Sequence, residues 1–205
     1  AYLRAFQRYF PDPLHYTDTA RPLLELGAAA CQPLLVDHIG RILGWNPYQR
    51  VSNIRILGSL LDRTGGSVAL FHRSALDWLA DPERSGDYFV DPEQGHRVLA
   101  EAGWREFQVD FVSMSAYMSR WLPTHLAIAK RRDDLVTCIT DAPYIRRAFL
   151  EGRHFELTPF WQDAANHQFR ETCKYSYDKL ADSGGVTADL YEAARAIGGL
   201  FQACG

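Results

Sequence analysis

Three polar residues near the C-terminus have the types and the spacing that acid–base chemistry needs. Asp163, His167 and Glu171 follow one another at intervals of four residues within 158–179, a segment with a strong helical pattern. Side chains at positions i, i+4 and i+8 of a helix point the same way, so an imidazole lies between two carboxylates. A histidine oriented by a neighbouring acid can act as a general acid or base. We therefore consider His167 a candidate catalytic residue, oriented by Asp163 and Glu171.

Another histidine and several arginines lie close to this segment in the sequence. His154 would supply a second imidazole to the same site. Only three of the 22 basic side chains are lysines, and the planar fork of arginine suits the recognition of carboxylate or phosphate groups. The expected substrate-binding residues are Arg146, Arg147, Arg153 and Arg170. This pattern favours a small cytosolic enzyme acting on an anionic small molecule or a modified peptide, and it indicates neither a metal site nor a particular cofactor.

The same segment also has an interpretation without chemistry. Its apolar residues form a helical stripe that consists of Trp161, Ala165, Phe169 and Cys173. The acid, histidine and acid would then lie on the solvated face of an amphipathic helix, with contacts worth about 0.2–0.5 kcal/mol each. Cys173 is open to two interpretations, a small apolar residue of the stripe or a nucleophile activated by nearby cations.

The elements that would position these residues are predicted mainly as helices. The pattern favours helices over 2–10, 17–32, 46–64, 91–102, 141–150 and 158–179, and a last one after Gly184-Gly185. Strands are expected at 67–71, 125–129 and 135–140, and 104–112 fits either a strand or a helix that continues to 121. The predicted fold is a helix-rich α+β single domain, 1–205, with a small sheet from the middle of the chain. Within it we expect a helical N-terminal region (residues 1–64), a mixed region (residues 65–142) and an all-helical C-terminal region (residues 143–205).

The segment 33–47, PLLVDHIGRILGWNP, has two interpretations. As a hairpin, it places strands at 34–36 and 41–45 around a turn that contains Asp37 and Gly40, with Asn46 following. An acid, a glycine and a later asparagine around such a turn resemble the opening hairpin of PAS-type sensor domains. This resemblance implies a non-catalytic module for ligand sensing or protein interaction. As a helix, the segment places Leu35, Ile39 and Ile42 or Leu43 on one apolar stripe.

Composition limits the classes of function. The chain has 205 residues, 47% of them hydrophobic, and no run of the roughly 18 apolar residues that a membrane helix needs. The formal net charge of -3 disfavours nucleic acid as the main partner and leaves a small-molecule ligand or a protein partner. The four cysteines lie far apart in the sequence, as expected for reduced thiols in the cytoplasm. The sequence contains no G-x-S-x-G, P-loop or H-E-x-x-H motif.

Overall fold

The computed structural model describes residues 2–70 and 73–166. Contacts between residues divide the chain into two compact units, Ala1–Ala102 and Gly103–Gly205. This boundary differs from the expected limits of the three regions at 64 and 142, and the single domain stays a prediction. Within the described residues, no helix combines the length and the apolar character needed to span a membrane.

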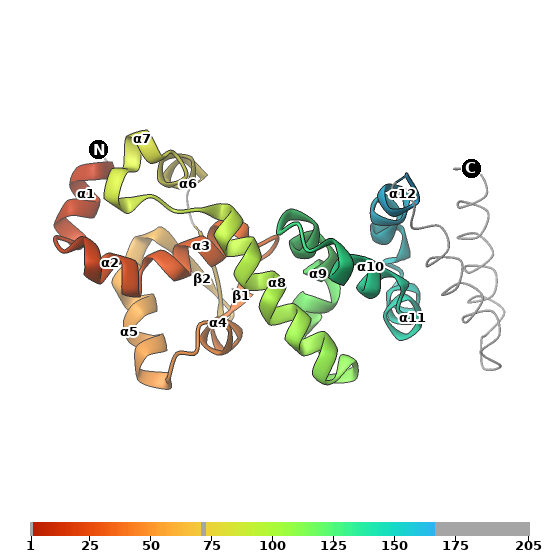
Figure 1. Cartoon of the computed structure of the whole chain (residues 1–205). Coiled ribbons are helices and arrows are strands. Elements are labelled where there is room, and N and C mark those ends of the chain that lie inside the picture. Colours follow the sequence, from red (N-terminus) through yellow and green to blue (C-terminus); the bar gives the residue numbers. More distant parts are fainter. Residues whose placement is uncertain (1, 71–72, 167–205) are drawn as a thin grey trace. The chain divides into compact units, whose positions relative to one another are not determined.

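The first unit consists of short helices and a small sheet (Figure 1). Its helices before the sheet hairpin are α1 (Tyr2–Tyr9), α2 (Pro13–Thr19), α3 (Arg21–Ala29), α4 (Val36–Ile42), α5 (Pro47–Leu57) and the 3-10 turn η1 (Gly58–Leu60). The strands are β1 (Leu34–Leu35), β2 (Leu61–Thr64) and β3 (Ser67–Leu70). The hairpin is followed by α6 (Arg73–Leu79), α7 (Pro82–Ser85), η2 (Gly86–Tyr88) and the first half of α8 (Pro92–Val109).

The sheet is antiparallel, with the strands in the order β1-β3-β2. Leu34 pairs with Val68, and Thr64 pairs with Ser67 at the end of the β2–β3 hairpin. Gly65 and Gly66 form the turn with φ of 59° and 81°, a left-handed conformation that favours glycine at both positions. The predicted α+β, helix-rich fold with a small sheet is confirmed, and the strand expected at 67–71 is β3.

The ambiguous segment 33–47 forms a two-residue strand followed by a helix. The hairpin interpretation is wrong, because β1 pairs with β3 and residues 36–42 form α4. Four residues join α4 to α5, and among them Gly44 has a φ of 66°. Helix-turn-helix units have such a short, glycine-containing turn. The elements α3, β1, α4 and α5 are followed by a hairpin whose strand β3 pairs back onto β1.

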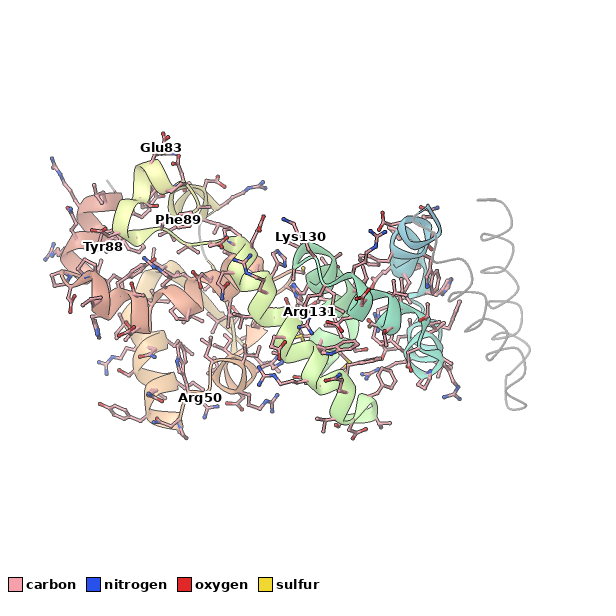
Figure 2. All side chains as sticks on the ribbon, in the orientation of Figure 1. Arg50, Glu83, Tyr88, Phe89, Lys130 and Arg131 are labelled. Atoms are coloured by element: carbon pink, nitrogen blue, oxygen red, sulfur yellow. The ribbon has the colours of Figure 1, made fainter. Side chains whose placement is uncertain are left out.

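Aromatic side chains from four distant segments form the core of the first unit. The ring of Phe6 lies between 5.1 and 6.1 Å from the rings of Phe10, Tyr16, Trp78 and Tyr88. Tyr16 Oη donates a hydrogen bond to the carbonyl of Tyr88, and Tyr88 Oη donates one to the carbonyl of Phe10, both at 2.8 Å. Burial raises the pKa of both tyrosines. These paired bonds satisfy the hydroxyl groups and hold α2 and the residue after α1 against η2, which ends at Tyr88 (labelled in Figure 2).

The described residues of the second unit are helical. They comprise the rest of α8, followed by η3 (Phe111–Ser113), α9 (Ala116–Ile128), α10 (Arg132–Thr140), α11 (Ala142–Leu150), η4 (His154–Leu157) and α12 (Thr158–Asn166). Helix α10 packs against α9, α11 and α12. The indole Nε1 of Trp161 donates a hydrogen bond of 2.9 Å to the carbonyl of Ile139 and so ties α12 to α10.

Several predictions of secondary structure in this unit are wrong. The strands expected at 125–129 and 135–140 are parts of α9 and α10, whose buried side chains recur at helical spacing, as at Leu122 and Leu126. Residues 104–109 continue α8, so the strand interpretation of 104–112 is also wrong. Gly103 does not end α8, because it lies inside the helix where Met118 and Leu122 pack closely against it.

A charged turn follows α9 and separates it from α10. Lys130, labelled in Figure 2 beside Arg131, has a φ of 59° and is the only non-glycine residue with positive φ among those described. The backbone N–H of Arg131 donates to the carbonyl of Leu126 at 2.9 Å, as in a Schellman C-cap. The turn therefore reverses the chain between two helices and not between two strands.

The predicted helix 158–179 is confirmed over its described residues. Helix α12 begins at Thr158 and has Pro159 in its first turn, a position where proline loses no backbone hydrogen bond. Residues 167–179 of that prediction, and the helix expected after Gly184-Gly185, lie outside the described residues.

Candidate functional site

The described members of the predicted catalytic set lie on different elements. Asp163 is exposed on α12, and His154 is exposed at the start of η4. The imidazole of His154 stacks on the ring of Phe149, with 4.4 Å between centroids and 15° between planes, and meets Phe155 edge-on. His167 and Glu171 lie outside the described residues, so the imidazole between two acids stays a prediction.

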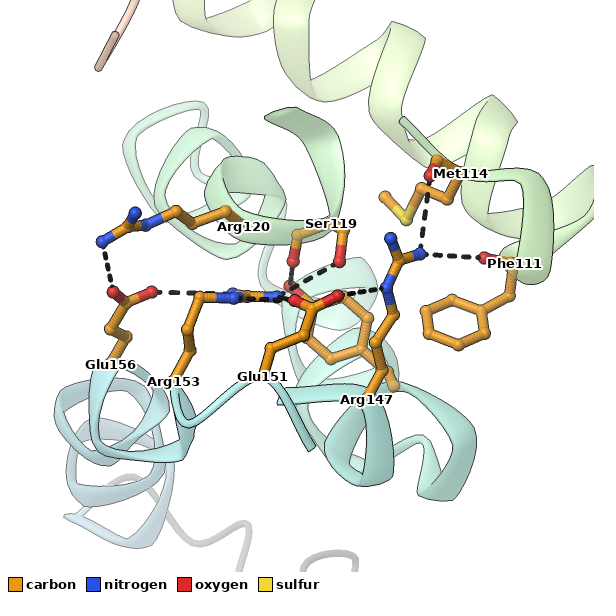
Figure 3. Close-up of polar contacts among 9 residues, drawn as sticks. Phe111, Met114, Ser119, Arg120, Arg147, Glu151, Arg153 and Glu156 are labelled. Atoms are coloured by element: carbon orange, nitrogen blue, oxygen red, sulfur yellow. Dashed lines mark hydrogen bonds and ion pairs between the residues drawn. The ribbon is translucent and has the colours of Figure 1, made fainter. Parts of the chain in front are cut away.

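Two of the predicted substrate-binding arginines meet at one carboxylate. Arg147 on α11 and Arg153 in the following loop both pair with Glu151, which follows the end of α11 (Figure 3). Arg146 precedes Arg147 but is exposed, and it makes no ion pair among the described residues. Arg170 lies outside that portion of the chain. The structure thus brings together Arg147 and Arg153, with Glu151 between them.

Arg147 joins α11 to the loop that precedes α9. Its Nε donates to Glu151 Oε1 at 2.9 Å. Its Nη1 lies 3.5 Å from the carbonyl oxygen of Phe111 and 3.4 Å from that of Met114, and the guanidinium also lies over the ring of Phe111. This side chain therefore holds the η3 loop in place, in addition to pairing with an acid.

Arg153 joins the α11–η4 loop to α9. It pairs with Glu151 on one side, and its Nη1 lies 3.6 Å from Glu156 Oε2 on the other. Its Nη2 donates to Ser119 Oγ at 3.3 Å, and Ser119 is buried on α9. Glu156 in turn accepts a hydrogen bond of 2.5 Å from Arg120, also on α9. The side chain of Arg153 is only 15% exposed, which makes it the most enclosed member of the group.

Alternating charges thus form a continuous row that we call the arginine–glutamate chain, in the order Arg147, Glu151, Arg153, Glu156 and Arg120 (Figure 3). Its members come from α9, α11, the loop after α11, and η4. Sequence reasoning missed both glutamates and Arg120. The signal for some of these pairs was present in the i,i+4 spacing of Arg147 and Glu151 and the i,i+3 spacing of Arg153 and Glu156.

The arginines of the arginine–glutamate chain favour the charged form of Glu151. Partial burial raises the pKa of Glu151, but the hydrogen bonds from Arg147 and Arg153 outweigh it, so the pKa lies below its ordinary value. Next to the arginine–glutamate chain, Tyr144 Oη donates a hydrogen bond of 2.7 Å to the carbonyl of Ser119. Burial raises the pKa of Tyr144 well above its ordinary value, so this phenol stays neutral and serves as a donor.

This arrangement restricts what the two arginines can bind. A bidentate clamp on a carboxylate or phosphate needs guanidinium donors directed at the ligand. Here the Nε donors of both Arg147 and Arg153 are directed at Glu151, and further donors reach the carbonyls of Phe111 and Met114 or the side chains of Ser119 and Glu156, so neither arginine presents its full fork to an anionic ligand. Among the described residues, no three histidine, cysteine, aspartate or glutamate side chains are grouped so as to hold a metal ion.

The described cysteines are not activated as nucleophiles. Cys31 is exposed, yet partial burial of its thiol raises its pKa, and Cys138 is fully buried with a pKa well above the ordinary value. A raised pKa lowers the fraction of thiolate, which is the nucleophilic form. Cys173, the candidate on the predicted helix, lies outside the described residues.

Comparisons with known proteins add no further information on this site. A scan against protein-family profiles, a search of curated proteins and a search of solved structures found no match to the chain.

Proposed function

We propose that this chain is a non-catalytic protein-interaction module. The observation that supports the proposal most is the arginine–glutamate chain, in which Arg147 and Arg153 are paired with acids of the same unit. These arginines act as ties between α9, α11 and η4 in place of a clamp for substrate. A rigid set of short helices is suited to presenting a surface to a partner.

Exposed apolar side chains beside these ties support the proposal. Leu150, the last residue of α11, is 65% exposed, and Phe155 in η4 is 62% exposed. Phe155 meets the edge of His154, which stacks on Phe149, so the aromatic groups support one another. Apolar and aromatic side chains held rigidly at a surface are typical of the centre of a protein interface.

The enzymatic hypothesis, an acid–base site at His167 acting on an anionic substrate, stays a prediction. It needs Arg147 and Arg153 to release Glu151 when substrate binds. If the arginines are kept for function, their replacement should leave the free energy of unfolding unchanged or raise it, as is common for functional residues. The two hypotheses therefore predict opposite effects of replacing the arginines.

Arg153→Met should lower the free energy of unfolding by about 1–2 kcal/mol, because it removes a hydrogen-bonded ion pair with Glu151, an ion pair with Glu156 and a hydrogen bond to Ser119. This figure is discounted for the 39% exposure of Glu151, which water partly solvates when the arginine is absent. Arg147→Met should cost a similar amount. Methionine keeps an unbranched apolar stem, so packing changes little. The measurement is urea unfolding of the full chain at neutral pH.

Arg146→Met is the matched control for these variants. Arg146 is exposed on the same helix and makes no ion pair among the described residues, so its replacement should change stability by less than about 0.5 kcal/mol. The proposal fails if the three variants are equally stable, or if Arg147→Met and Arg153→Met are more stable than the natural chain.

A further inference from the structure

The outward face of α5 combines apolar groups with positive charge. Tyr48 is 81% exposed and Val51 is 67% exposed, whereas Ile54 and Leu57 on the same helix are buried. Arg55 is exposed four residues after Val51, so Tyr48, Val51 and Arg55 lie on one stripe at positions i, i+3 and i+7. We call these three residues the α5 stripe.

The α5 stripe lies in a portion of the chain that is locally positive. Helix α5 contains Arg50 and Arg55 but no acid, and Arg41 is exposed on the adjoining α4. The only acid in the two helices, Asp37, is paired with Arg50 (labelled in Figure 2). Among the described residues, Arg41 and Arg55 make no ion pair, so their charges are available to a partner.

We propose that the α5 stripe binds an acidic amphipathic helix of a protein partner. The apolar side of such a helix would cover Tyr48 and Val51, and its flanking carboxylates would pair with Arg55 and Arg41. The charge of the stripe is opposite to the formal net charge of the whole chain, which is -3, so an acidic helix that the chain as a whole repels is attracted to this face. The inference rests on the proposed function as an interaction module and specifies its partner.

Duplex DNA is the rival occupant, because helix-turn-helix units commonly place their second helix in the major groove. The side chains argue against it. Bases are read mainly by arginine, lysine, asparagine and glutamine. On α5, Gln49 forms the capping box with Asn46, and Arg50 pairs with Asp37, so two side chains of these types are already engaged within the protein. Asn53 and Arg55 are left beside the exposed Tyr48 and Val51. The acidic net charge also opposes the phosphate contacts that supply most of the affinity for nucleic acid.

The test is a fluorescence-anisotropy titration of the full chain with labelled peptides of about three heptads. One peptide carries leucine at positions a and d and glutamate at e and g, and its matched version carries lysine at e and g. The natural chain should bind the glutamate peptide about tenfold more tightly than the lysine peptide. Arg55→Glu should abolish this preference, and Tyr48→Ala should weaken binding of the glutamate peptide about tenfold, the range of one well-buried interface side chain.

A double replacement on α1 serves as the matched control. Arg8→Glu with Tyr9→Ala changes an exposed cation and an aromatic side chain that is 67% exposed, outside the α5 stripe, and should leave binding unchanged. The inference is overturned if the peptides bind equally, if Arg55→Glu keeps the preference, or if a DNA duplex of about 20 base pairs binds more tightly than the glutamate peptide. Each of these results leaves the stability test of Arg147 and Arg153 unaffected, so the inference can fail while the proposed function stands.

Discussion

Gly95→Ala should lower the free energy of unfolding by about 3 kcal/mol. A Cβ atom at Gly95 would lie 2.0 Å from the backbone carbonyl oxygen of Glu25 and 2.8 Å from the Cβ of Ala29. Both contacts belong to α3, whose backbone would have to move away from α8 to make room. Alanine favours a helix over glycine by about 1 kcal/mol, but the overpacking outweighs that gain. Urea unfolding of the full chain measures the difference.

Gly103→Ala, on the same helix, is the control for this effect. Its added Cβ would meet Leu122 Cδ1 and Met118 Sδ, each at 2.9 Å, and both atoms end flexible side chains. A small rotamer change relieves those contacts, so the expected loss is less than about 1 kcal/mol. If Gly95→Ala proved as stable as Gly103→Ala, the close packing of α8 on α3 would be contradicted.

Phe6→Ala should lower the free energy of unfolding by about 3–5 kcal/mol, as is usual when a buried phenylalanine is truncated. Phe6 is 2% exposed and contacts the rings of Phe10, Tyr16, Trp78 and Tyr88. The cavity would form where α1, α2, α6 and η2 meet. The measurement is again chemical unfolding, followed by tryptophan fluorescence because Trp78 lies in this core.

Tyr9→Ala on the same helix provides the comparison for Phe6. Tyr9 is 67% exposed, so its truncation should change stability by less than about 0.5 kcal/mol. Equal effects at positions 6 and 9 would mean that α1 is not held by its aromatic contacts.

The sequence predicted the starts of helices from their cap signals, whereas its predictions of where helices end were less accurate. The helix expected over 46–64 ends at Leu57, and residues 61–64 form β2. Asn46-Pro47 marks the start of α5, where Asn46 and Gln49 form a capping box in the structure. In contrast, 125–129 and 135–140 are short apolar runs, which period alone cannot assign to strand or helix. These segments are helical because α9 packs against α10. Such tertiary contacts can override the local propensity that the sequence shows.

The candidate site was only partly predictable, for a related reason. The arginines were visible as a cluster, but whether they bind a ligand or the protein depends on where the chain places the acids. Glu151 and Glu156 lie close in sequence to Arg147 and Arg153, whereas Arg120 and Ser119 come from a helix more than thirty residues away. The spacing of residues along the sequence reveals close neighbours such as Glu151 and Glu156. It gives no information on residues of another helix, such as Arg120 and Ser119.

A double-mutant cycle between Arg153 and Glu151 tests most directly the central claim, that the arginine–glutamate chain holds the helices together. The cycle compares the unfolding free energies of the natural chain, Arg153→Met, Glu151→Gln and the double variant. We expect both single variants to be less stable and a coupling free energy of about 1 kcal/mol, since removal of either partner already breaks the contact. A coupling free energy of zero, with Arg153→Met as stable as the natural chain, would contradict the account and leave Arg153 available as a clamp for an anionic substrate.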